Sequence, residues 1–91
     1  MFEIVEYCKY NRTTAGVRID YKTLSRWTEL PVEVIAKLAE SVDKPYRYCD
    51  RVPGGLIYRI SHFGLPKMAN IAEGASSTKL NAIYQIICQA L

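Results

Sequence analysis

The chain has 91 residues, a mass of 10.4 kDa and a formal net charge of +3 at neutral pH. This length is enough for one small hydrophobic core and excludes a two-domain enzyme, because a second core would need about 50 further residues. Hydrophobic residues make up 49% and charged residues 23% of the chain, which is typical of a globular domain and excludes an intrinsically disordered one.

Three features favour a soluble cytoplasmic protein without a metal. No apolar stretch approaches the roughly 18 to 20 residues that cross a bilayer, so no membrane association is expected. The acidic Glu3 and Glu6 stand where a signal peptide carries bases. The cysteines Cys8, Cys49 and Cys88 lie about 40 residues apart, which fits neither a disulfide framework nor a metal-binding spacing. We expect reduced and mostly buried thiols.

The first fifth of the chain predicts a short helix and a small strand. From Phe2 to about Asn11, apolar residues recur at steps of three and four, as on one face of an amphipathic helix. Residues 11–16 are predicted to form a loop. Residues 17–19 then alternate apolar and charged side chains, which indicates a small edge strand.

Two helices separated by a very short turn are predicted next. Asp20 is a suitable N-cap for a helix from Tyr21 to about Glu29, with Leu24 and either Trp27 or Thr28 facing inward. Pro31 suits the first turn of the following helix. That helix is expected over residues 32–42, and its inward side chains are Ile35, Leu38, Ala39 and Val42.

The second half of the chain predicts a hairpin and further helical structure. Residues 46–51 and 56–61 have the period of two that is typical of strands, and residues 52–55 form the turn between them. A short helical segment is expected from Pro66 to about Glu73. Residues 76–78, Ser-Ser-Thr, are predicted to cap a last helix with a wide apolar stripe.

This order of elements resembles the winged helix-turn-helix family. The pair Leu24-Ser25, followed by Leu30, Pro31 and Ile35, occupies the positions that this family typically fills with the same kinds of residue. The departures are Trp27, Thr28 and Glu29, the last of which replaces a common turn glycine. The resemblance implies an α+β, mostly helical fold with a small β-hairpin wing, a domain over residues 1–74 and an additional C-terminal helix over residues 75–91.

In the family, the second helix of the pair enters the major groove of double-stranded DNA. Its expected outward face consists of Val32, Glu33, Ala36, Lys37, Glu40 and Ser41. Residues 27–43 carry four acids and one lysine, a local charge of −3, whereas residues 9–26 and 44–67 each sum to +4. We therefore expect weak nonspecific affinity from the helix itself and phosphate contacts from its basic flanks.

The resemblance implies specific roles for these side chains. The residues expected to read base edges are Val32, Glu33, Ala36 and Lys37. The Glu33 carboxylate would accept a hydrogen bond from the amino group of cytosine, and Val32 or Ala36 would contact the thymine methyl group. The expected phosphate contacts are Lys22, Arg26 and Lys44, and the expected wing contacts are Arg47, Arg51 and Arg59. A solvated set of surface charges without a ligand is the alternative.

The apolar stripe of the last helix is wider than a solvated monomeric helix needs. Homodimerisation through Leu80, Ile83, Tyr84, Ile87 and Leu91 would bury this stripe. A twofold axis would then place two DNA-binding helices one turn of DNA apart, about 34 Å, over a palindromic site. The alternative is that this helix packs back onto its own chain and completes the core.

Nothing in the sequence indicates catalysis, a cofactor or a small-molecule substrate. The single histidine, His62, has no nucleophile or second imidazole at a recognised spacing. The seven tyrosines are scattered, which favours core and rim packing over a stacking surface for single strands. The expectation is a non-enzymatic, sequence-specific DNA-binding protein, acting as a transcriptional regulator or a partition-type DNA organiser. The alternative is a protein interaction module or adaptor, including a viral or phage inhibitor of a host protein.

Overall fold

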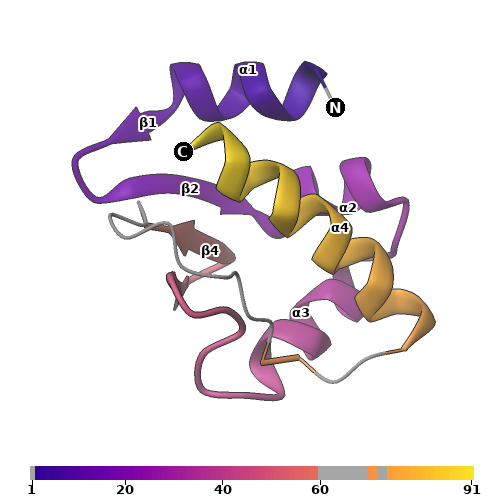
Figure 1. Ribbon diagram of the computed structural model, residues 1–91. Helices are drawn as coiled ribbons and strands as arrows, with labels where there is room; N and C mark the ends of the chain where they lie inside the picture. Colours follow the sequence, from indigo (N-terminus) through magenta and orange to yellow (C-terminus); the bar gives the residue numbers. More distant parts are fainter. Residues whose placement is uncertain (1, 60–69, 72–73) are drawn as a thin grey trace.

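The computed structural model describes residues 2–59, 70–71 and 74–91. This part of the chain is α+β and mostly helical. The elements in chain order are α1 (Phe2–Tyr10), β1 (Arg12–Thr13), β2 (Gly16–Asp20), α2 (Tyr21–Thr28), α3 (Val32–Glu40), β3 (Cys49–Val52), β4 (Gly55–Tyr58) and α4 (Ala75–Ala90). In Figure 1, α1 and α3 lie on opposite sides of the molecule and α4 runs across the space between them. None of the described helices has the length and apolar character that a membrane span requires.

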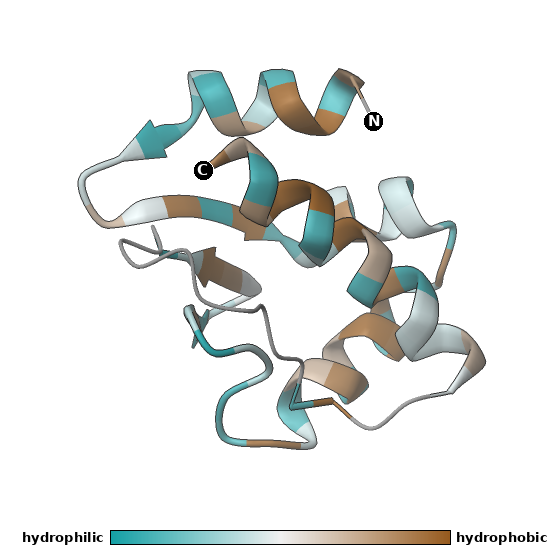
Figure 2. Ribbon diagram, in the orientation of Figure 1, coloured by the Kyte–Doolittle hydropathy of each residue, from teal (hydrophilic) through white to brown (hydrophobic). Residues whose placement is uncertain are grey.

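The four described strands form one antiparallel sheet in the order β1-β2-β4-β3. Strand β2 alternates buried Val17 and Ile19 with exposed Arg18, and the same alternation of hydropathy is visible along its ribbon in Figure 2. The sequence predicted β2 as an edge strand, and this was wrong. The predicted loop contains the two-residue strand β1, which pairs with one side of β2 while β4 pairs with the other.

The β3–β4 hairpin is shorter than predicted and turns at Pro53 and Gly54. Its tip is held by two hydrogen bonds. The backbone N–H of Tyr21 donates to the Gly54 carbonyl oxygen over 3.0 Å, and the Arg18 guanidinium donates to the Pro53 carbonyl oxygen over 2.7 Å. The tip of the hairpin is therefore fastened to the start of α2.

The predicted N-cap of α2 is confirmed. The Asp20 carboxylate accepts a hydrogen bond from the Thr23 N–H over 2.8 Å, which satisfies one of the free donors at the start of the helix. The hydrogen bonds from Thr23 lower the pKa of the Asp20 carboxyl below its ordinary value. The cap fixes the point at which the sheet strand ends and α2 begins.

A short turn, residues 29–31, joins α2 to α3. Glu29 adopts the left-handed conformation, with φ 62° and ψ 20°, at the position where the family that the sequence resembles commonly has glycine. The Thr28 hydroxyl is buried, donates to the Leu24 carbonyl and accepts from the Leu30 N–H. The Ser25 hydroxyl donates to the Leu30 carbonyl. These side-chain hydrogen bonds hold the turn in one conformation.

Helix α4 packs against α1, α2 and α3. Leu80, Tyr84 and Ile87 are buried in the same core as Ile4 and Leu24, so residues 75–91 complete the core of the preceding segment. The predicted cap at residues 76–78 was wrong. The helix already begins at Ala75, and the Thr78 hydroxyl donates back to the Gly74 carbonyl over 2.8 Å.

Two predicted segments lie wholly or partly outside the described residues. The helical segment expected from Pro66 to about Glu73 falls there except for residues 70–71, and the last residues of the second hairpin strand, 60–61, also fall there. His62 belongs to the same region.

Candidate nucleic-acid interface

The outward side of α3 is open to solvent. Ile35 and Ala39 are fully buried and fix this helix to the core, while Val32, Glu33 and Lys37 are exposed and Ala36 is partly buried. We call the set Val32, Glu33, Ala36, Lys37, Glu40 and Ser41 the α3 face. The four residues predicted to read bases therefore lie on one side of one helix, as the helical period requires.

A shallow hollow of about 300 Å³ lies between the end of the α3 face and the hairpin tip. The residues that line it are Tyr21, Glu40, Arg51, Val52, Pro53 and Gly54. The Arg51 guanidinium donates to the Glu40 carbonyl oxygen over 3.4 Å, so this cation sits at the C-terminal end of α3, where the helix dipole favours positive charge. Burial raises the pKa of Tyr21, and the nearby Glu40 carboxylate adds to this shift. The start of α2, the end of α3 and the hairpin thus meet at one place.

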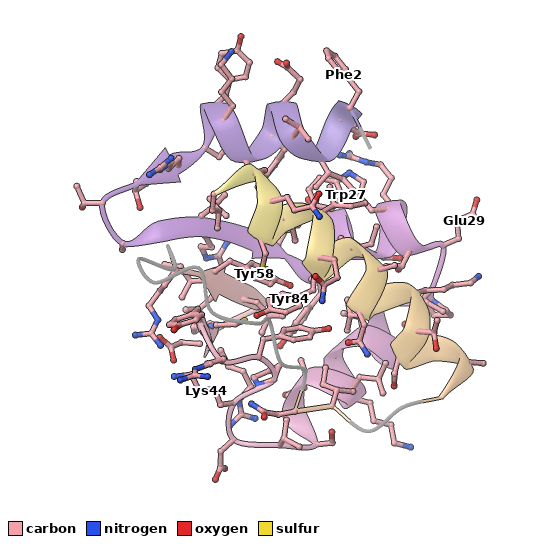
Figure 3. All side chains as sticks on the ribbon, in the orientation of Figure 1. Phe2, Trp27, Glu29, Lys44, Tyr58 and Tyr84 are labelled. Carbon is pink, nitrogen blue, oxygen red and sulfur yellow. The ribbon has the colours of Figure 1, made fainter. Side chains whose placement is uncertain are left out.

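The three side chains that were predicted to contact phosphates do not lie together in the structure. Lys22 is exposed in the first turn of α2, next to Tyr21 of the hollow. Arg26 instead forms an ion pair with Glu3 of α1, with 2.7 Å between the guanidinium nitrogen and the carboxylate oxygen. Lys44 follows the end of α3, and in Figure 3 it lies on the opposite side of the molecule from Glu29, which precedes α3. Lys22 and Lys44 therefore lie close to the ends of the helix pair, whereas Arg26 points toward α1.

The three predicted wing arginines do not converge either. Arg47 precedes β3 and stacks over the Tyr48 ring, with its guanidinium carbon 5.7 Å from the ring centroid. Arg59 follows β4 and forms an ion pair with Asp50 over 3.2 Å. Only Arg51 of the three lines the hollow at the hairpin tip.

The side chains predicted for dimerisation are largely covered by their own chain. Leu80, Tyr84 and Ile87 are buried, and Ile83 and Leu91 are partly buried against the core. The apolar stripe of α4 is therefore filled within one molecule, which is the alternative that the sequence left open. Its width reflects contacts with several elements rather than one.

The buried thiols and tyrosines have raised pKa values. Burial raises the pKa of the Cys8 thiol to about 11 and that of the Cys49 thiol to about 12, and neither is in a disulfide. Tyr46, Tyr58 and Tyr84 pack together in the core, where burial raises each pKa. Figure 3 shows Tyr58 and Tyr84 beside one another beneath α4. The buried thiols and tyrosines are therefore neutral core residues at physiological pH.

Within the described ranges, no three His, Cys, Asp or Glu side chains gather as metal ligands would.

Sequence reasoning did not single out Arg18 or Trp27 for the roles that they have. Arg18 is the outward residue of a central strand, and its partner is a carbonyl 35 residues away, so no local pattern indicates the contact. Trp27 packs edge-on against the Tyr7 ring, with 5.3 Å between the ring centroids, because Thr28 takes the inward position of α2.

Comparisons of the chain with protein-family models, with curated proteins and with solved structures found no match to any of them.

Proposed function

We propose that the protein binds double-stranded DNA as a winged helix-turn-helix protein, with α3 as the recognition helix. The arrangement of the elements supports this proposal. Helix α1, the strands β1 and β2, the helices α2 and α3 across a short turn and the β3–β4 hairpin follow one another, and β4 pairs with β2. Apart from the short strand β1, this is the order of elements that the resemblance implies. The short hairpin would serve as a wing whose tip lies against the start of α2.

The observation that carries the proposal is the exposure of the α3 face. Ile35 and Ala39 anchor the helix, and the hydrogen bonds of Ser25 and Thr28 fix the turn before it. The opposite side of the helix therefore stands in a defined orientation, with five of the six residues of the α3 face exposed and Ala36 partly buried against the core. A helix held in this way fits a major groove about 12 Å wide.

The side chains of the α3 face have functional groups that suit base edges. Glu33 would accept a hydrogen bond from the cytosine amino group, and Lys37 would donate to the acceptors of guanine. Val32, which is 37% exposed, and Ala36 would contact thymine methyl groups. Lys22, Lys44 and Arg51 would contact phosphates at the two ends of the helix pair. Binding and occlusion of a DNA site would then be the mechanism, as in a transcriptional regulator or a DNA-organising protein.

The acids of this region limit the strength of nonspecific binding. Glu29, Glu33 and Glu40 are exposed near the phosphates that the helix would approach, and each repels the DNA backbone. Few phosphates are neutralised in this arrangement, so we expect a shallow dependence of affinity on salt. Specific contacts to bases must then supply much of the binding free energy.

Selection of bound duplexes from a random pool, followed by fluorescence anisotropy titration, tests the proposal. Binding of the selected duplex should weaken between about 50 mM and about 200 mM salt, and a scrambled duplex should bind more weakly at both. No enrichment in the selection, together with no salt-dependent binding at micromolar protein, would overturn it.

The second candidate function is a protein interaction module of the same fold. It is favoured by the excess of acids on the α3 face, since Glu33 and Glu40 flank a single Lys37. An adaptor would give no enriched duplex in the same selection. The two functions are therefore separated by one experiment.

A further inference from the structure

Arg18 is an outward residue of β2 whose side chain contacts the hairpin. Its neighbours Val17 and Ile19 are fully buried, whereas Arg18 is exposed. Its guanidinium donates to the Pro53 carbonyl oxygen over 2.7 Å, which is at the short end of the range for a hydrogen bond between nitrogen and oxygen. The two residues are 35 positions apart in the chain. A long side chain on the surface is thus bound to one backbone acceptor on a different element.

The hairpin turn that accepts this bond has little packing of its own. Pro53 and Gly54 are exposed. Apart from the chain neighbours of Gly54, no described atom lies within 4 Å of the position that a Cβ atom would take there. Beyond the pairing of the strands, two hydrogen bonds connect the turn to the other described residues, one from the Arg18 guanidinium and one from the Tyr21 N–H. Both donors belong to the segment where β2 ends and α2 begins.

Arg51 connects the same hairpin to α3 by a weaker contact. It lies on β3, just before the turn, and its guanidinium donates to the Glu40 carbonyl oxygen over 3.4 Å, a distance at which a hydrogen bond is weak. In the proposed function, Arg51 gives up this carbonyl and contacts a phosphate instead. The exchange removes one contact between the hairpin and α3. The shorter bond from Arg18 is on a different element and remains.

The surroundings of Arg18 suit it less well for a phosphate contact of its own. Asp20 is two residues further along β2 and so on the same side of the strand. The hydrogen bonds from Thr23 lower the pKa of the Asp20 carboxyl most, and the Arg18 charge lowers it further. Asp20 is therefore ionised at neutral pH, and a phosphate that approached Arg18 would also meet this carboxylate.

We infer that Arg18 is a positioning residue of the wing, which holds the hairpin tip against the start of α2 while Arg51 exchanges the Glu40 carbonyl for a DNA phosphate. The inference rests on the proposed function and deepens it, because it assigns a role in DNA binding to a residue that does not touch DNA. A hairpin tip that is already fixed loses less conformational entropy when Arg51 binds. Without the Arg18 bond, the turn should move and Arg51 should meet the phosphate less often in the required geometry.

Amide hydrogen exchange of the full chain tests the positioning without DNA. Arg18→Met keeps most of the aliphatic stem and removes the donor and the charge. In this variant the Tyr21 N–H should exchange about fivefold faster, because its acceptor, the Gly54 carbonyl, moves with the turn. The Glu29 N–H, which donates within the end of α2, should keep its rate. Arg12→Met on β1 is the matched control, since it removes another exposed arginine of the sheet and should leave both rates unchanged.

A double-mutant cycle with Arg51→Ala tests the link to DNA binding. Arg18→Met alone should weaken binding of the selected duplex severalfold. The combined variant should bind no more weakly than Arg51→Ala alone, because the turn then has no phosphate contact left to position. Its salt slope should be lower than that of the unaltered protein by about one. If Arg18 contacted a phosphate itself, the two losses would multiply and the slope would fall by about two.

The results separate the inference from the proposed function. An unchanged Tyr21 exchange rate in Arg18→Met, or losses that multiply in the combined variant, would overturn the inference and leave the proposed function standing. An unaltered protein that binds no duplex would overturn both. Faster Tyr21 exchange together with the non-additive cycle would support both, and circular dichroism of each variant confirms that the helices remain folded.

Discussion

Tyr46 and Tyr84 stack face to face, with ring centroids 3.8 Å apart and ring planes 12° from parallel. The contact joins the segment before β3 to the middle of α4. The Tyr46 hydroxyl also donates to the Asn81 side-chain oxygen over 2.8 Å, so one tyrosine binds α4 by stacking and by a hydrogen bond. Tyr58 packs 6.1 Å from Tyr84 and 6.3 Å from Tyr46, between ring centroids. This cluster explains why α4 is inseparable from the rest of the core.

The two hydroxyl groups of Tyr46 and Tyr58 should contribute differently to stability. Tyr46→Phe should lower the free energy of unfolding by about 1 kcal/mol, because it removes a hydrogen bond and leaves the Asn81 oxygen without its donor. Tyr58→Phe should leave stability unchanged or raise it, since the buried Tyr58 hydroxyl has no hydrogen-bond partner among the described residues. Urea unfolding followed by Trp27 fluorescence measures both. An equal loss of unfolding free energy in the two variants would contradict the prediction that only the Tyr46 hydroxyl stabilises the fold through a hydrogen bond.

Glu29→Gly should stabilise the protein. Glu29 has φ 62°, a conformation that costs a side chain with a Cβ atom more than it costs glycine. The substitution should raise the free energy of unfolding by about 0.5 to 1 kcal/mol. Glu29→Val provides the contrast, because a β-branched side chain is strained further there and should destabilise. Thermal unfolding of the two variants and of the unaltered protein shows whether each substitution raises or lowers stability. A loss of stability in Glu29→Gly would refute the argument.

Stability should fall at alkaline pH. Burial raises the pKa of Cys8 to about 11 and that of Cys49 to about 12, from the ordinary value of 9.0. Between these values the unfolded chain loses the thiol protons while the folded chain keeps them. The contribution of these thiols to the free energy of unfolding should therefore be constant below about pH 8 and decline as pH rises above 9, by at most about 1.4 kcal/mol per pH unit for each thiol.

Urea unfolding at a series of pH values between neutrality and about pH 10.5 checks this decline. Cys49→Ala is the informative variant. It should lower stability at neutral pH by leaving a small cavity, yet show a shallower decline, because one titrating group has been removed. A variant whose decline is as steep as that of the unaltered protein would show that Cys49 makes no contribution.

The proposed DNA contacts lead us to expect different effects on DNA binding when three basic residues are substituted. Arg51→Ala, at the hairpin tip, should weaken binding to all duplexes alike and lower the salt slope by about one. Lys37→Ala should instead change the preferred sequence, as expected of a base contact. Arg26→Ala is the control, because Arg26 is paired with Glu3 on the α1 side of the molecule and should leave affinity unchanged. Anisotropy titrations against selected and scrambled duplexes distinguish the three results.

Local chemistry made several elements predictable from the sequence. The Asp20 cap, the short turn before Pro31 and the hairpin turn at Pro53 and Gly54 depend on residues close to one another in the chain, and the structure has all three. Apart from β1, the order of the described helices and strands followed from the same signals. The α+β, mostly helical class was therefore accessible without knowledge of any long-range contact.

Contacts between distant residues account for what the sequence did not predict. The pairing of β2 on both sides depends on Arg12 and Tyr58, which are far from each other in the chain. The stripe of α4 suggested an exposed surface because its length and hydrophobicity are local properties, whereas its burial depends on partners such as Tyr46. For the same reason, the ion pair between Arg26 and Glu3 could not be read from the positions of the two residues.

The opposite placement of α1 and α3 has a consequence for how the protein can be handled (Figure 1). Tyr10 is exposed at the end of α1, so a label or an anchor attached there stands on the side of the molecule away from α3. The protein can therefore be immobilised on a sensor surface through α1 while α3 remains accessible.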